Sequence, residues 1–434
     1  MTAPVSDPPA LLRRLLDEAV AVARPERCLP PVLAELERSR GFGPAGRMLV
    51  LGAGKAAAAM AQTVERAWPE RDLEGLVVTR YGHAVPCRRI RVLEAAHPVP
   101  DRAGAEAAAQ ISELARGAGA EDAVLFLLSG GASALLSLPA PGLTLAGKQA
   151  VTRALLAAGA DIHELNAVRK HLSAIKGGRL AAGAAPARLT TLAISDVAGD
   201  DPATIGSGPT VADPTTLADA RRVLEHYDIA PGPEVTAALD DPANETVKPG
   251  DPRLAGAHYR LIATPAQSLA AAARLAKAEG LAVEMLGDDL TGEARDLGRD
   301  HAALARERAA RRQGERPLLL LSGGETTVTL AGGGPETRKG GPNTEYLLGL
   351  AGALDGMPGV WALAADTDGA DGSEDNAGAI IGPDTLERAR RRGLRPAAFL
   401  ADNDAWSFFD ALDDLVVTGP THTNVNDFRA ILIA

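Results

Sequence analysis

Positive charge gathers in one short segment of a chain whose formal net charge is −11. The segment ELNAVRKHLSAIKGGRLA, residues 164–181, ends beside a glycine pair and contains Arg169, Lys170, His171, Lys176 and Arg179. Cations near a helix end favour the helix dipole, and two glycines can end a helix. That accounts for Lys176 and Arg179 but not for the other three cations. We therefore expect the segment to form one wall of a site for a phosphate-rich ligand.

A glycine turn with a lysine inside it follows the first apolar stretch. In LVLGAGKAA, residues 49–57, Gly52 and Gly54 match the G-x-G-x-x-A pattern between a strand and a helix. No acid that could hold a ribose hydroxyl ends the next strand, and the turn lacks the serine or threonine of a P-loop. Lys55 would add a full charge to the exposed amides of a helix N-terminus, which predicts an anion site.

Two further turns have the sequence Ser-Gly-Gly. Each offers a hydroxyl and backbone amides to phosphate oxygens, although glycines also serve tight turns that need positive φ. The turns are Ser129-Gly130-Gly131 and Ser322-Gly323-Gly324.

Acidic residues follow two other apolar stretches. SDVAGDD contains Asp196, Asp200 and Asp201, and DTDGADGSED contains Asp366, Asp368 and Asp371. The second run resembles a calcium loop but lacks its final glutamate. Carboxylates that face lysines and phosphate-binding turns suit magnesium-dependent phosphoryl transfer, which needs positioning, charge neutralisation and one base. We expect Asp366 and Asp368 to be magnesium ligands.

The order of the elements predicts an α/β fold. Strand-like and helix-like stretches alternate along the chain, and glycine turns recur where strands end. We expect two α/β domains with mainly parallel, Rossmann-like sheets and a cleft between them. The Pro-, Asp- and Gly-rich stretch around residues 227–253 marks the boundary, which gives domains at residues 1–240 and 255–434.

Composition excludes several classes of protein. The negative charge argues against nucleic-acid binding, which needs a basic footprint. The two cysteines have no metal-type spacing, which favours a reducing compartment. No signal peptide is evident, and the longest apolar stretch is too short to span a bilayer. We expect a cytoplasmic protein without a membrane partner, either a monomer or a homodimer.

Five longer motifs resemble the class II glycerate kinase family, whose C-terminal part is the MOFRL domain. They are NAVRKHLSAIKGGRLA, SDVAGDDPATIGSGPTVADPTT, SGGETTV, DTDGADG and TGPTHTNVNDF, in that order along the chain. The resemblance extends from about Leu11 to Ile433. It implies ATP-dependent phosphorylation of D-glycerate at O2, with Mg²⁺ accompanying ATP.

The resemblance also implies roles for single residues. Lys55, Asp196 and Glu325 match the lysine of the family's first glycine turn, the aspartate of its S-D-V stretch and the glutamate of its S-G-G-E turn. We expect Lys55 and Asp196 to be catalytic. Two alternatives stay open: an NADP-dependent hydroxypyruvate reductase, and a metabolite-binding relative of the kinase that has lost catalysis.

One position departs from the family pattern. The family commonly has G-G-R-N-Q-E where this chain has GGPNTE, so Pro342 replaces an arginine while Asn343 is kept. Proline has neither the charge nor the N–H to grip an anion. Arg338 lies four residues upstream, and we expect its planar fork to serve as the substitute.

Overall fold

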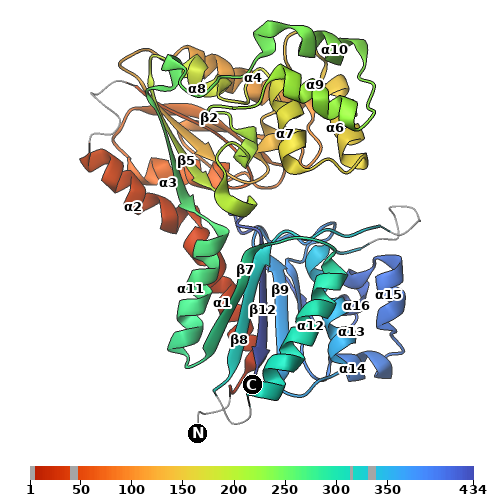
Figure 1. The fold of residues 1–434 in the computed structure, drawn as a ribbon. Coiled ribbons are helices and arrows are strands. Elements are labelled where there is room, and N and C mark those ends of the chain that lie inside the picture. Colours follow the sequence, from red (N-terminus) through yellow and green to blue (C-terminus); the bar gives the residue numbers. More distant parts are fainter. Residues whose placement is uncertain (1–4, 40–46, 313–315, 331–338) are drawn as a thin grey trace. The chain divides into compact units, whose positions relative to one another are not determined.

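The protein, described here by a computed structural model, forms two compact α/β units (Figure 1). The structure describes residues 5–39, 47–312, 316–330 and 339–434. The N-terminal unit comprises residues 25–262, and the C-terminal unit comprises residues 1–24 and 263–434. Two α/β units are what the sequence predicts. The cleft expected between them stays a prediction.

The N-terminal unit is built on a six-stranded sheet with the order β3-β2-β1-β4-β5-β6. Neighbouring strands from β3 to β5 run parallel, and β1 and β4 are buried along their whole length, as in a sheet covered on both faces. The strands are β1 (Met48–Ala53), β2 (Leu73–Arg80), β3 (Ile90–Ala95), β4 (Ala123–Leu128), β5 (Arg188–Ile194) and β6 (Ala257–Ala263).

Helices of the N-terminal unit fall into two groups. One group packs on the sheet and consists of α3 (Ala57–Ala67), α4 (Arg102–Arg116), α5 (Ala132–Leu135) and α8 (Arg179–Ala184), with α2 (Pro25–Arg38) packed against α3. The other shares a separate apolar core and consists of α6 (Leu145–Ala157), α7 (Ile162–His171), α9 (Leu217–His226) and α10 (Pro233–Asp240).

The C-terminal unit has a six-stranded sheet with the order β11-β10-β9-β12-β8-β7. The strands are β7 (Ala282–Leu290), β8 (Leu318–Gly324), β9 (Val360–Asp366), β10 (Gly378–Ile381), β11 (Leu415–Val416) and β12 (Asp427–Ile433). Among the described pairings β7–β8 is parallel and the others are antiparallel. The expectation of a mainly parallel sheet is therefore wrong for this unit, because the last strand of the chain inserts antiparallel between β8 and β9.

Helices of the C-terminal unit cover both faces of its sheet. They are α1 (Pro8–Ala23), α11 (Pro265–Ala278), α12 (Ala294–Arg311), α13 (Pro342–Leu354), α14 (Thr385–Arg391), α15 (Pro396–Asp402) and α16 (Ala405–Asp410). Helices α1 and α11 share one core with the sheet, whereas α12, α13 and α16 contribute to another.

The compact units of the structure divide the chain at other residues than the predicted domains. Helix α1 begins after Asp7, whose side chain accepts from Ala10 N at 3.0 Å, and it packs in the C-terminal unit. Its leucines share a core with α11, and Thr423 Oγ1 donates to Ala23 O at 2.8 Å. Strand β6 adds to the N-terminal sheet, so the second unit resumes at residue 263 instead of 255.

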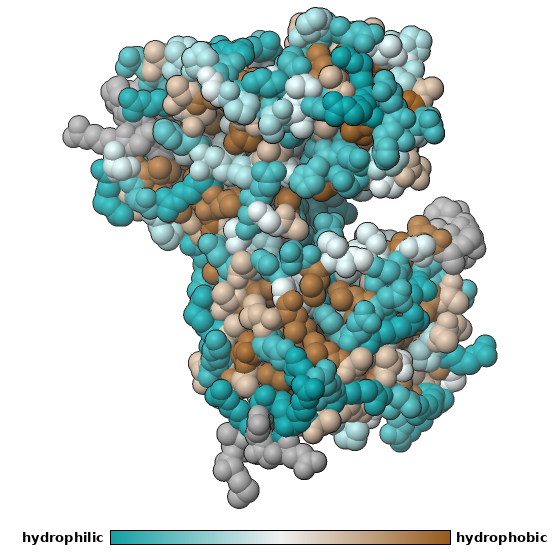
Figure 2. Space-filling model, viewed as in Figure 1, coloured by the Kyte–Doolittle hydropathy of each residue, from teal (hydrophilic) through white to brown (hydrophobic). Residues whose placement is uncertain are grey.

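Polar and apolar residues are interspersed over the face shown in Figure 2. Within the described ranges, no helix combines the length and the apolar character needed to cross a membrane.

The packing of α1 predicts a stability effect that is remote in sequence. Leu12 of α1 is fully buried in the core that α1 shares with α11 and the C-terminal sheet. Leu12→Ala should therefore destabilise that unit by about 2–5 kcal/mol. Amide hydrogen exchange should show lost protection in α11 but not in α4. The exposed Ile162→Ala is the matched control. Loss of protection in α4 alone would contradict the assignment of α1.

Candidate functional site

Three of the predicted site residues follow neighbouring strands of the N-terminal sheet. Ala53 of β1 pairs with Leu128 of β4, and Leu128 pairs with Ala193 of β5, so these strands end at one level. Lys55, Ser129 and Asp196 come one to three residues after these positions. The carboxyl edge of a parallel sheet is where α/β proteins bind ligands. The structure therefore brings Lys55 and Asp196 to a single edge.

The turn that carries Lys55 is packed tightly against the first Ser-Gly-Gly turn. Gly54 has φ 134°, and a Cβ there would lie 2.1 Å from Ser129 Oγ. Ala56 N donates to Ser129 Oγ at 3.0 Å, and Lys55 N donates to Gly130 O at 2.8 Å. The amides that the sequence leaves exposed for an anion are thus bonded within the protein. The prediction that exposed amides of this turn bind phosphate is therefore wrong for the amides of Lys55 and Ala56.

Gly52 also has a packing role, because a Cβ there would lie 2.5 Å from Leu127 O. A dinucleotide bound in the Rossmann manner places its pyrophosphate on the N-terminal amides of the helix after β1. Since Ser129 Oγ and Gly130 O occupy amides at that place, the G-x-G-x-x-A pattern serves turn packing here.

The cationic segment divides into structural and cavity-lining residues. Lys170 Nζ forms a buried ion pair with Asp213 at 3.3 Å, and His171 Nε2 lies 2.9 Å from Glu245 Oε1. Arg179 donates to Lys170 O at 2.8 Å and also to Asn244 O. These three basic residues are held by residues distant in sequence. The prediction that the whole segment faces a phosphate is therefore wrong for them.

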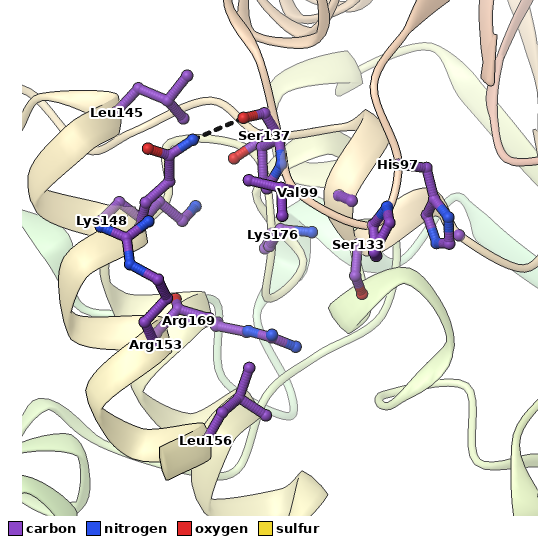
Figure 3. Close-up of a pocket in the computed structure, with 16 residues that line it drawn as sticks. His97, Val99, Ser133, Ser137, Leu145, Lys148, Arg153, Leu156, Arg169 and Lys176 are labelled. Carbon is purple, nitrogen blue, oxygen red and sulfur yellow. Dashed lines mark hydrogen bonds between the residues drawn. The ribbon is translucent and has the colours of Figure 1, made fainter. Parts of the chain in front are cut away.

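Arg169 and Lys176 line a cavity of about 340 Å³ (Figure 3). The cavity lies between α6, the segment 97–100 and the turns after β4 and α7. Its cationic residues are Lys148, Arg153, Arg169 and Lys176, and none of its sixteen lining residues is acidic. Gln149 Nε2 donates to Pro100 O at 2.6 Å and so ties α6 to the segment on the opposite wall.

Lys148 is the most unusual of these cations. Its side chain is 5 % exposed, and its Nζ has no hydrogen-bond partner. Burial, followed by the charges of Arg169 and Arg179, lowers the pKa of Lys148 to about 7. Burial also lowers the pKa of Lys176, whose Nζ donates to Gly206 O at 3.1 Å. Such groups gain from any anion that enters the cavity.

Sequence reasoning missed Lys148 although a signal was available. Helix α6 buries Lys148, Val151 and Leu155, which follow each other at helical spacing, so the lysine stands on the apolar face of its helix. It also missed His97 and Ser133. Both line the cavity, and a Cβ on Gly131 would lie about 3 Å from the His97 ring and 3.3 Å from Lys55 Cγ. Lys55 thus stands next to the glycine that borders the cavity.

Two motifs that carry the family resemblance contact each other next to this cavity. Ser207, in the stretch after Asp196, donates to Asn166 Oδ1 of α7 at 3.0 Å and lies 2.9 Å from Ser133 Oγ. Asp201 accepts from Thr204 Oγ1 at 2.7 Å, which marks it as a turn residue. Burial raises the pKa of Tyr259 on β6, and the charges of Asp201, Asp196 and Asp200 raise it further. The acidic turn therefore lies beside β6.

Gly323 and Asn343, two predicted residues of the C-terminal unit, belong to a buried network. Arg429 donates to Gly323 O at 3.0 Å and to Asp427, and Asn343 Nδ2 donates to Asp427 Oδ1 at 2.7 Å. Asp371 accepts from Asn343 N and Thr344 N, both at 2.9 Å, and caps α13. Burial raises the pKa of Asp371 to about 6.

The glycines of the second Ser-Gly-Gly turn also serve packing, since a Cβ on Gly324 would lie 2.2 Å from Leu290 O. Ser322 is buried within β8, and the neighbouring Glu325 is exposed. Pro342 occupies the first position of α13, where proline is favoured. Arg338 lies outside the described residues.

Of the expected magnesium ligands, Asp366 ends β9 and Asp368 lies in the turn that follows. Asp366 Oδ1 accepts from Asp368 N at 2.9 Å, and Asp368 Oδ1 accepts from Ala370 N at 2.8 Å. In the part of the chain that the structure describes, no three His, Cys, Asp or Glu side chains form a metal-binding group. Magnesium binding by this pair stays a prediction.

Comparison with known proteins agrees with this two-unit architecture. Residues 11–240 match the model of a domain of unknown function, DUF4147, and residues 318–427 match the MOFRL family. A protein of Agrobacterium vitis with a provisional hydroxypyruvate reductase name is 53 % identical over 98 % of this chain and 94 % of its own. The D-glycerate 2-kinase of Thermotoga maritima is 37 % identical over 98 % of this chain and 99 % of its own.

The crystal structure of glycerate kinase from Thermotoga maritima superposes with a TM-score of 0.84 at 36 % identity, covering 98 % of this chain and 99 % of that one. The matches define a protein that joins a DUF4147 domain to a MOFRL domain. The chain belongs to the class II glycerate kinase family.

The lowered pKa of Lys148 predicts a pH-dependent stability difference. Between the folded pKa of about 7 and the ordinary 10.5, the unfolded chain binds a proton that the folded chain does not. This lysine therefore makes stability rise with pH across that window. Lys148→Met should raise the free energy of unfolding by a few kcal/mol at pH 7, because one pKa unit corresponds to about 1.4 kcal/mol.

Urea unfolding at pH 7 and at pH 10 would measure this effect. The gain from Lys148→Met should shrink at the higher pH, whereas the exposed Lys277→Met control should change stability little at either pH. An equal gain in the free energy of unfolding at both pH values would mean that Lys148 stays charged in the folded protein from pH 7 to pH 10, and would contradict the lowered pKa.

Proposed function

We propose that the protein is a glycerate kinase that transfers the γ-phosphoryl group of ATP to O2 of D-glycerate. One observation carries the proposal: Lys55 and Asp196 come to one edge of the N-terminal sheet, and Lys55 stands next to Gly131, which borders a cavity with four cationic residues and no acid. A phosphoryl-transfer enzyme needs a base and concentrated positive charge in one place. Relatives named as glycerate kinases support this reading.

The proposed roles follow from the position of each side chain. Asp196 would accept the proton of the O2 hydroxyl as that oxygen attacks the γ-phosphorus. A new O–P bond forms, the bond to the bridging oxygen breaks, and ADP leaves. Lys55 would offset charge on the transferring group. Its backbone is fixed, since Lys55 N donates to Gly130 O and Lys55 O accepts from Thr79 Oγ1 at 3.2 Å.

Magnesium would accompany ATP and neutralise phosphate charge. Proteins commonly hold this ion through one or two carboxylates together with substrate phosphates. Asp366 at the end of β9 and Asp368 in the turn that follows are our candidates for those carboxylates.

A hydroxypyruvate reductase is the second candidate, because proteins 53 % identical to this chain have that provisional name. The packing of the first glycine turn argues against it. The amides of Lys55 and Ala56, at the place where a nicotinamide dinucleotide would bind its pyrophosphate, are bonded to the Ser129 turn.

Two assays distinguish these functions. With ATP, Mg²⁺ and D-glycerate, enolase should consume the product directly, since it uses 2-phosphoglycerate. A signal that requires phosphoglycerate mutase would mean transfer to O3. Oxidation of NADPH or NADH by hydroxypyruvate, followed at 340 nm without ATP, would instead establish the reductase.

Two variants test the assigned roles. Asp196→Asn keeps the shape of the side chain but cannot accept the proton, so kcat should fall at least a hundredfold while KM for D-glycerate changes little. Lys55→Met should also lower kcat, by roughly the 3–4 kcal/mol that a lost oxyanion donor costs. The exposed Lys277→Met is the matched control. An effect of Asp196→Asn on KM alone would make Asp196 a binding residue.

A further inference from the structure

The cavity beside Lys55 combines two features that a three-carbon acid would not need. Cationic side chains line it, and so do apolar side chains that are exposed to solvent. Among the described residues seven large hydrophobic side chains are exposed, and two of them, Val99 at 58 % and Leu156 at 55 %, line this cavity. They come from different elements, the segment after β3 and the last turn of α6.

The cationic side chains of the cavity call for more than one negative charge. Lys148, Arg169 and Lys176 come from α6, α7 and the turn after α7 and line the same space (Figure 3). Lys148 is buried with an unpartnered Nζ, and no lining residue is acidic. Buried cations without counter-charges are costly, so the site is built for an anion that supplies them. A monocarboxylate would neutralise one of the three, whereas a diphosphate could meet them all.

The size of the cavity agrees with a larger ligand. A volume of about 340 Å³ is in the range of sites that bury a ligand with an organic body, and such sites combine apolar walls with a few polar groups. A nucleoside diphosphate has both parts, a flat apolar base and a polyanionic tail.

We propose that this cavity binds the nucleotide, with the base between Val99 and Leu156 and the phosphates toward Lys148, Arg169 and Lys176. The placement rests on the proposed kinase function and assigns the nucleotide to the N-terminal unit. Gly131 belongs to the cavity lining, and its neighbour Lys55 would meet the terminal phosphate.

Calorimetric binding of ADP and of inorganic pyrophosphate, without glycerate, tests the cationic and the apolar lining separately. Lys148→Met should weaken both ligands tenfold or more, because both depend on the cationic side chains. Leu156→Glu should weaken ADP tenfold or more but change pyrophosphate much less, because pyrophosphate has no base. Leu156 is exposed, so this variant should fold. The controls Ile162→Glu and Lys277→Met, which alter exposed residues outside the cavity, should leave both affinities unchanged.

The results separate this placement from the proposed function. ADP binding that depends on Lys148 and Leu156 in a protein without kinase turnover would uphold the site and reject the function. Kinase turnover with ADP affinity within twofold of wild type in both variants would uphold the function and overturn the site. A raised KM for D-glycerate in Lys148→Met, with unchanged ADP affinity, would also overturn it and place the acid in the cavity.

Discussion

The close approach of two turns, at Gly54 and Ser129, is the constraint on which the rest of the candidate site depends. The backbone of Gly54 lies where any side chain would collide with Ser129, and its φ of 134° disfavours other residues. Ser129 Oγ and Gly130 O then accept the first amides of the turn before α3. This joins β1 rigidly to β4, so that Lys55 is carried on a fixed backbone next to Gly131 and the cavity. Preorganised charge of this kind needs no rearrangement during phosphoryl transfer.

The cationic cavity shows what the fold tolerates for the sake of a site. Lys148 and Lys176 are nearly fully buried, and burial together with the charge of Lys148 lowers the pKa of Lys176. A core built for stability alone would place apolar side chains at these positions. The protein instead anchors the cluster on α6 and α7, whose shared apolar core with α9 and α10 holds the helices in place. Buried lysines with a lowered pKa are typical of functional sites.

Much of the site's framework could be predicted from the sequence, since glycine turns after apolar strands imply a common sheet edge. The pairing of individual cations could not. Lys170 and His171 are held by Asp213 and Glu245, more than forty residues further along the chain, so local sequence gave no means to separate them from Arg169. The antiparallel insertion of β12 and the packing of α1 beside α11 also depend on contacts between distant parts of the chain.

Pro342 illustrates how structure changes the meaning of a departure from a family pattern. In the sequence it looks like a lost anion contact. In the fold it is the first residue of α13. The N–H that proline lacks is one of the groups that have no partner within a helix. The next two amides, of Asn343 and Thr344, are bonded to the buried carboxylate of Asp371. The helix start is therefore complete without an arginine, and Asn343 still reaches Asp427 in the network around Arg429. The substitution keeps the local architecture, so any effect on function has to come from the lost charge and not from a damaged loop.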